Sequence, residues 1–177
     1  MPTSNEAANL WMAFQDQALR GLDQVAGWRN FLSLSIDPSF ESHERLALCR
    51  VKDDCTWRYA VWDACADSKR CFQSPETILR LKLRKIDPAY RVATGAVLAE
   101  DLQALLHSTK NLRLPVGGAS KGVGMDGTFY AISIGDPMME STFKWWESLP
   151  EEWGPLADLH SRLLCILKRA RESMAGG

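Results

Sequence analysis

The chain has 177 residues, of which 46% are hydrophobic and 24% are charged. This balance is typical of one globular domain with a sizeable core, and it argues against intrinsic disorder. The formal net charge is -1. Proteins that bind the nucleic-acid backbone usually carry a basic excess, so the composition disfavours that class of function.

The N-terminus lacks the basic segment and the uninterrupted apolar run of a secretory signal. No apolar run elsewhere is long enough to span a bilayer. We therefore expect a cytoplasmic protein with no membrane partner. Its cysteines are not closely spaced and are expected to be reduced thiols: Cys49, Cys55, Cys65, Cys71 and Cys165.

The N-terminal third predicts a helix followed by three strands. Thr3 and Glu6 fit a capping box, and apolar residues recur at helical spacing as far as Gly27, the expected end of the helix. Alternating apolar and polar residues then predict three strands, over residues 31–36, 44–52 and 55–63. The Asp53-Asp54 pair suggests a tight hairpin between the last two.

The middle of the chain predicts a loop, a strand and a short helix. Residues 64–75 are polar and indicate a loop, whereas residues 98–108 carry leucines at helical spacing. Between them, residues 77–85 (TILRLKLRK) alternate apolar and basic side chains, which predicts a strand with one basic face. That face would consist of Arg80, Lys82 and Arg84.

The last third is the unit around which we expect the domain to be built. Residues 128–134 and 141–147 predict a pair of strands, and a helix should begin near Gly154 with Pro155 in its first turn. An apolar stripe on that helix can cover the sheet: Leu156, Leu159, Leu163, Ile166, Leu167 and Ala170. We predict a single α+β domain over residues 1–177, mostly an antiparallel sheet packed by N-terminal, middle and C-terminal helices.

No sequence pattern indicates a catalytic centre, a cofactor or a metal. The glycines of residues 122–127 match G-x-G-x-x-G, but a strand follows them where a dinucleotide site needs a helix, so we interpret this segment as a loop. The three histidines lack the spacing of metal ligands. Cys165 lies about 140° from His160 around the predicted helix, and we expect Cys165 in the core. The sequence therefore leans against an enzyme.

Two features point towards binding. The basic strand face would attract an acidic protein, although a solvated face that prevents aggregation explains it as well. The adjacent Trp145 and Trp146 should point to opposite sides of a strand, so that one joins the core and the other is exposed or covered by the corner at Trp153. An exposed tryptophan would mark an interface. The candidate binding residues are Arg80, Lys82, Arg84, Trp145, Trp146 and Trp153.

The C-terminal pattern resembles one found in small bacterial proteins of unknown function. It comprises Asp126-Gly127-x-x-Tyr130-x-Ile132, Phe143-x-Trp145-Trp146 and Pro150-x-x-Trp153-x-x-Leu156, followed by a terminal helix. Such chains are stand-alone cytosolic α+β proteins, and some resemble immunity proteins of polymorphic toxin systems. The resemblance concerns architecture, and it implies no catalytic residue.

Our leading hypothesis is a non-enzymatic protein that binds another protein, in one version a toxin that it neutralises. The first alternative is a small enzyme whose site is assembled from separated loops, with Cys or Asp residues near residues 117–127. The second, weaker alternative is nucleic-acid binding through Arg80, Lys82 and Arg84.

Overall fold

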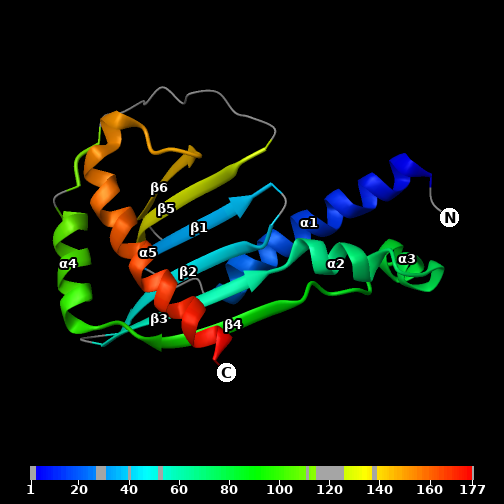
Figure 1. Cartoon of the computed structure of the whole chain (residues 1–177), viewed down its shortest axis with the longest axis horizontal. Coiled ribbons are helices and arrows are strands. Elements are labelled where there is room, and N and C mark those ends of the chain that lie inside the picture. Colours follow the sequence, from blue (N-terminus) through cyan, green and yellow to red (C-terminus); the bar gives the residue numbers. More distant parts are fainter. Residues whose placement is uncertain are drawn as a thin grey trace.

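The computed structural model describes residues 3–26, 31–39, 41–51, 54–110, 112–114, 126–136 and 139–176. In this part of the chain six strands form one antiparallel sheet in the order β4-β3-β2-β1-β5-β6 (Figure 1). The strands are β1 (Leu32–Pro38), β2 (His43–Val51), β3 (Asp54–Trp62), β4 (Tyr90–Ala96), β5 (Thr128–Asp136) and β6 (Met139–Trp146). The predicted α+β fold is confirmed.

Helices lie on both faces of this sheet. They are α1 (Ser4–Ala26), α2 (Ala64–Cys71), α3 (Pro75–Lys82), α4 (Ala99–Lys110) and α5 (Gly154–Ala175), with a 3-10 turn, η1 (Glu151–Trp153), before α5. Figure 1 shows α5 crossing one face beside α4, whereas α1 lies behind the sheet and α2 and α3 extend beyond its end. An ion pair between Arg169 and Asp101 joins α5 to α4. None of the described helices combines the length and apolar character needed to cross a membrane.

The larger core lies between α5 and the sheet. Leu32 and Leu34 of β1 pair with leucines of β2 on one side and isoleucines of β5 on the other. Above them, every residue of the predicted α5 stripe is buried: Leu156, Leu159, Leu163, Ile166, Leu167 and Ala170. The prediction for the C-terminal unit is therefore confirmed in both its strands and its helix.

The smaller core lies under α1, on the opposite face. Ala47 and Ala60 are 1% and 0% exposed, and their small side chains let the helix approach β2 and β3 closely. Gly21 permits another close approach, because a Cβ there would lie 2.1 Å from the Tyr90 hydroxyl oxygen. That hydroxyl donates to the carbonyl oxygen of Ala18 at 2.8 Å. In this way α1 is fixed to the half of the sheet formed by β2, β3 and β4.

The middle of the chain differs from the predictions. The predicted loop over residues 64–75 contains α2, because the Asp63 carboxylate caps the helix by accepting from the Ala66 amide at 2.8 Å. The predicted strand over residues 77–85 is wrong, and residues 75–82 form α3. Ser74 and Thr77 form a capping box there, with a proline in the first turn, and these signals favour a helix. The edge strand β4 was not predicted.

The first helix, the first three strands and the helix over residues 98–108 are confirmed within a few residues. Thr3 and Glu6 make the predicted capping box, since the Thr3 amide donates to the Glu6 carboxylate at 2.9 Å and the Glu6 amide to the Thr3 hydroxyl at 3.3 Å. Gly27 and residues 122–125 of the predicted glycine loop lie outside the described residues.

A buried carboxylate joins α2 to the sheet. Asp67 is 2% exposed, and its Oδ2 accepts from the indole Nε1 of Trp62 at 2.8 Å and from the Ala89 amide at 3.0 Å. Its Oδ1 pairs with the Arg70 guanidinium at 2.8 Å. Trp62 is fully buried under α1, so this one side chain fixes α2 and the segment before β4 to the smaller core.

We expect Asp67→Ala to lower the free energy of unfolding by about 3 kcal/mol, because two buried N–H donors lose their acceptor. Urea denaturation followed by tryptophan fluorescence measures the change. Lys69→Ala, at an exposed position of the same helix, serves as the control and should cost under about 0.5 kcal/mol, since exposed surface substitutions have little effect on stability. Equal effects of the two substitutions would contradict the assigned role of Asp67.

Candidate protein-binding site

The structure divides the six candidate binding residues between two regions. Arg80 and Lys82 lie in α3, with Arg84 just beyond its end, whereas the three tryptophans lie at β6 and η1. Because α3 is a helix, Arg80, Lys82 and Arg84 do not lie in one row, as they would on one face of a strand. The groups must therefore be considered separately.

A groove of about 540 Å³ runs between α1 and α3 and receives two of the three basic residues. Lys82 and Arg84 line it, whereas the Arg80 guanidinium donates at 3.5 Å to the carbonyl oxygen of Lys85 and is not part of the lining. Across the groove, Arg20 pairs with Asp16 at 2.7 Å. The lining thus holds three cations and one carboxylate, and its positive excess comes from α3.

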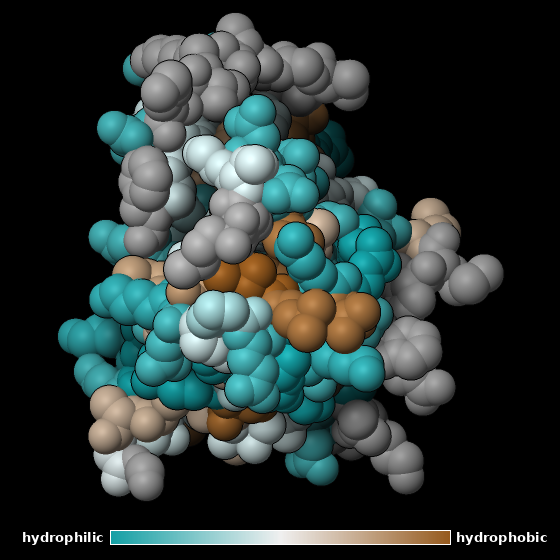
Figure 2. All heavy atoms as spheres, turned by 90° about the vertical axis from the view of Figure 1, so that its right-hand side faces the viewer, coloured by the Kyte–Doolittle hydropathy of each residue, from teal (hydrophilic) through white to brown (hydrophobic). Residues whose placement is uncertain are grey.

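The groove also has an apolar floor. Phe14, Leu81 and Ile86 line it and are 3%, 5% and 7% exposed. Leu79 and Leu83, on the same stretch as the basic residues, are 56% and 54% exposed. Figure 2 looks at this end of the molecule and shows hydrophobic side chains gathered among hydrophilic ones. Apolar surface with a basic rim is what a binding face for an acidic, amphipathic partner requires.

The positive charge of Lys82 also acts on Glu6, near the start of α1. A hydrogen bond from the Thr3 backbone and then the positive charge of Lys82 hold the pKa of the Glu6 carboxyl below its usual value. The carboxylate is fully exposed, so the effect shows the reach of the Lys82 charge along this side of α1 rather than a contribution to stability.

Trp145 and Trp146 lie on opposite faces of β6, as the sequence predicted for adjacent strand positions. Trp145 is 4% exposed in the larger core, stacked on Tyr130 with ring centroids 5.6 Å apart. Trp146 points to the opposite face and contacts Phe129, with ring centroids 4.5 Å apart, and Phe129 is 42% exposed. Trp153 packs edge-on against Phe143 at 5.9 Å. Trp146 and Trp153 are thus both half-buried, and Trp146 lies beside the exposed ring of Phe129.

A polar cluster that the sequence did not predict lies beside α1. Arg45 is 8% exposed, and its guanidinium donates to Asp23 and to Asp37, each at 2.6 Å. The Nδ1 of His43 lies 3.0 Å from the same Asp37 oxygen, and its ring stacks on Trp62. Burial alone would raise the pKa of Asp37, but His43 and Arg45 together hold it below its usual value. The cluster attaches α1 to β1 and β2.

A second cluster joins the C-terminal helix to the sheet. Glu44 accepts two bonds from the Arg171 guanidinium, at 2.6 and 2.9 Å, and one from the Tyr59 hydroxyl at 2.6 Å. Burial and the neighbouring carboxylate raise the pKa of Tyr59. A pocket of about 260 Å³ adjoins this cluster. His160 also lines it, and burial lowers the pKa of its imidazole.

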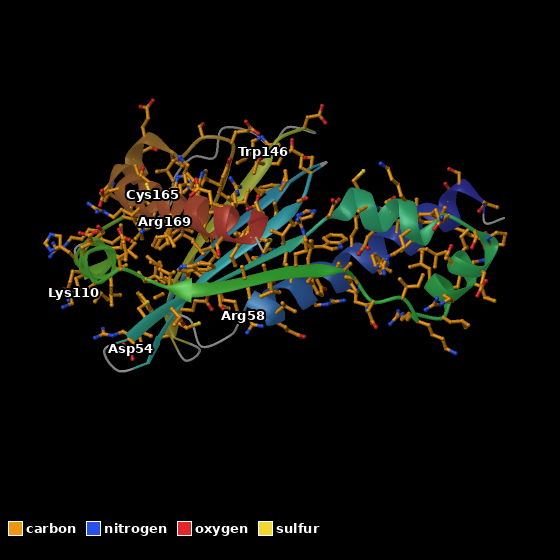
Figure 3. The ribbon with its side chains drawn as sticks, turned by 60° about the horizontal axis from the view of Figure 1, so that its bottom comes forward. Asp54, Arg58, Lys110, Trp146, Cys165 and Arg169 are labelled. Carbon is orange, nitrogen blue, oxygen red and sulfur yellow. The ribbon has the colours of Figure 1, made fainter. Side chains whose placement is uncertain are left out.

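Three of the thiols lie in surroundings that disfavour the thiolate. Burial raises the pKa values of Cys49, Cys55 and Cys71, the second to about 11, which makes them poorer nucleophiles. Cys165 is exposed on α5 (Figure 3), so its expected place in the core is wrong. Among the described residues, no group of three or more His, Cys, Asp or Glu side chains could hold a metal ion.

Comparisons with known proteins do not assign the chain to a family. We found no match for it among protein-family models, curated proteins or solved structures.

We expect Asp37→Asn to lower the free energy of unfolding at neutral pH by about 1–3 kcal/mol, because Arg45 then loses one of its two carboxylates. A carboxyl with a lowered folded pKa contributes stability above its ordinary value, 3.8, and loses it as the pH falls through the lowered value. The gap between wild type and variant should therefore shrink below about pH 4. Urea denaturation at several pH values measures it, and a gap independent of pH would contradict the pairing.

Proposed function

We propose that the protein is a non-enzymatic binding protein that holds an acidic, partly apolar segment of a second protein in the groove between α1 and α3. The observation that carries the proposal is the presence of Lys82 and Arg84 on the rim of a groove whose floor includes Phe14 and Leu81. A toxin that the protein neutralises in the cytoplasm is the version implied by the resemblance of the C-terminal pattern to immunity-like proteins.

The two parts of the groove would act at different stages of binding. The positive excess of the lining steers an acidic partner during encounter, and this contribution weakens as salt is added. Apolar side chains of the partner then cover the exposed Leu79 and Leu83 beside the groove and the small part of its floor that is still accessible, at about 25 cal/mol for each Å² removed from solvent. An amphipathic helix laid between two helices combines both contributions.

The polar clusters elsewhere support a binding role because their groups already serve the architecture. Arg45 joins α1 to the sheet, Glu44 joins α5 to it, and Asp67 joins α2 to it. Each of these buried or half-buried charges makes at least two polar contacts. In the groove, by contrast, Lys82 and Arg84 border solvent-filled space.

The groove can be tested with a pair of synthetic amphipathic peptides that differ only in carrying glutamate or lysine on the polar face. We expect the acidic peptide to bind more tightly in fluorescence anisotropy and to lose affinity with added salt. Ala13→Trp fills the groove from α1 and should weaken binding by at least about tenfold, a change of about 1.4 kcal/mol. Ala8→Trp, on the same helix and also exposed, is the matched control.

The toxin version has its own test, co-expression with the product of a neighbouring gene. Protection of the cells should be lost in the Lys82→Glu/Arg84→Glu variant and kept in Lys168→Glu, an exposed charge reversal on α5. If the neighbouring product is harmless, the toxin version fails while the groove proposal stands. If both peptides bind equally and Ala13→Trp changes nothing, the groove proposal itself is wrong.

A further inference from the structure

The strand β6 ends the sheet on one side, and its outer edge has the features of a pairing site. In the described part of the chain the strand order stops at β6, and no strand lies beyond it (Figure 1). Its ladder with β5 is regular from Phe129↔Trp146 to Asp136↔Met139 and has no bulge. It also holds no proline. Bulges and prolines are two of the devices by which natural edge strands prevent pairing with another chain.

The ladder with β5 determines which backbone groups face outward. Residues of an antiparallel strand alternate between those that bond the neighbour on one side and those that bond the other side. The Glu147 amide donates to the Thr128 carbonyl oxygen at 2.9 Å, so odd-numbered positions of β6 bond to β5. The N–H and C=O groups of Glu140, Thr142 and Lys144 therefore point to the outer edge.

From this geometry we infer that β6 pairs antiparallel with β6 of a second copy of the chain, about a twofold axis at Thr142. In that register Glu140 lies opposite Lys144 of the second copy, and the symmetry repeats the pair. Opposite charges directly across a ladder stabilise it, and like charges destabilise it. Glu140, Thr142 and Lys144 are all exposed, so pairing at this edge would not disturb any contact of the core.

Other arrangements lack this complementarity. Because only even-numbered positions face outward, the register can shift only in steps that keep even opposite even. Centring the axis on Glu140 or on Lys144 would place like charges opposite each other. Centring it on Ser141 or Phe143 would place Thr142 opposite Glu140 or Lys144, so neither register forms an opposite-charge pair. The other edge of the sheet, β4, carries Arg91 and no carboxylate, so its self-pairing offers no opposite-charge pair. The charges of β6 thus select one edge and one register.

The resulting dimer joins two sheets into one. On the face opposite α5, the Ser133 and Thr142 hydroxyls lie 2.8 Å apart, and the axis would continue this hydroxyl row into the second copy. A single strand pair is smaller than a standard protein interface. We therefore expect association that depends on protein concentration over the micromolar range.

Charge reversal tests the inference, with analytical ultracentrifugation as the measurement. Lys144→Glu and Glu140→Lys should each weaken dimerisation by at least about tenfold, since two attractive pairs become repulsive. The double variant should dimerise again, because the pairs are restored with exchanged signs. An equimolar mixture of the two single variants should form a heterodimer for the same reason. Lys110→Glu, at the end of α4 (Figure 3), controls for net charge.

Cross-linking tests the register independently. Thr142→Cys would place two thiols about the axis, and Cα atoms of a hydrogen-bonded pair are about 5.5 Å apart, within disulfide range. The exposed Cys65 and Cys165 are first replaced by serine. Oxidation should cross-link Thr142→Cys and not Ser141→Cys. A monomer at all concentrations, a dimer that ignores both charge reversals, or preferential cross-linking at Ser141→Cys would overturn the inference.

Discussion

The packing of the α5 stripe on the central strands holds the rest of the molecule in place. Leu159 and Leu163 are fully buried against a sheet surface that includes Leu34, Leu46 and Ile132. Each such side chain contributes about 1.5–3 kcal/mol when it leaves water. An antiparallel sheet that is covered on one face can leave part of its opposite face open to water. The second layer is accordingly smaller and lies over one half of the sheet.

That smaller layer determines where the proposed binding groove lies. Ala47 and Ala60 admit α1 closely, and the indole of Trp62 binds the Asp67 carboxylate at the start of the α2–α3 segment. The side of α3 that carries Leu81 then meets α1, which leaves Lys82 and Arg84 at the rim. The groove is thus supported by the smaller core, so substitutions in the α5 stripe should affect it only through global stability.

The sequence predicted those elements that are long enough to repeat their pattern. The 22 residues of α5 give its stripe several turns, and all six residues of the predicted stripe are buried. The eight residues of α3 give no such repetition. There the alternation of Leu79, Leu81 and Leu83 matched a strand, although Ser74 and Pro75 already carried the signal for a helix start. These capping signals predict a helix at this position, and a helix separates the basic residues that a strand would have aligned.

The candidate site was less predictable than the fold because its contacts join distant segments. The positive charge of Lys82 marks it as a candidate binding residue, but nothing in the local sequence places it opposite Phe14 of α1. The bond between Glu44 and Arg171 spans 127 residues and has no spacing signature. The tryptophans were local enough to assign to faces, since adjacent strand positions always point apart.

The edge pairing and the groove have a joint consequence for binding. The groove lies between α1, which packs on the β2–β4 half of the sheet, and α3, which contacts α1. The proposed dimer axis lies at β6, the opposite edge (Figure 1). Pairing through β6 would therefore leave both grooves uncovered and directed apart. Two such grooves cannot engage one short segment together, but they can engage a partner that is itself a dimer, with the gain in affinity that bivalence brings.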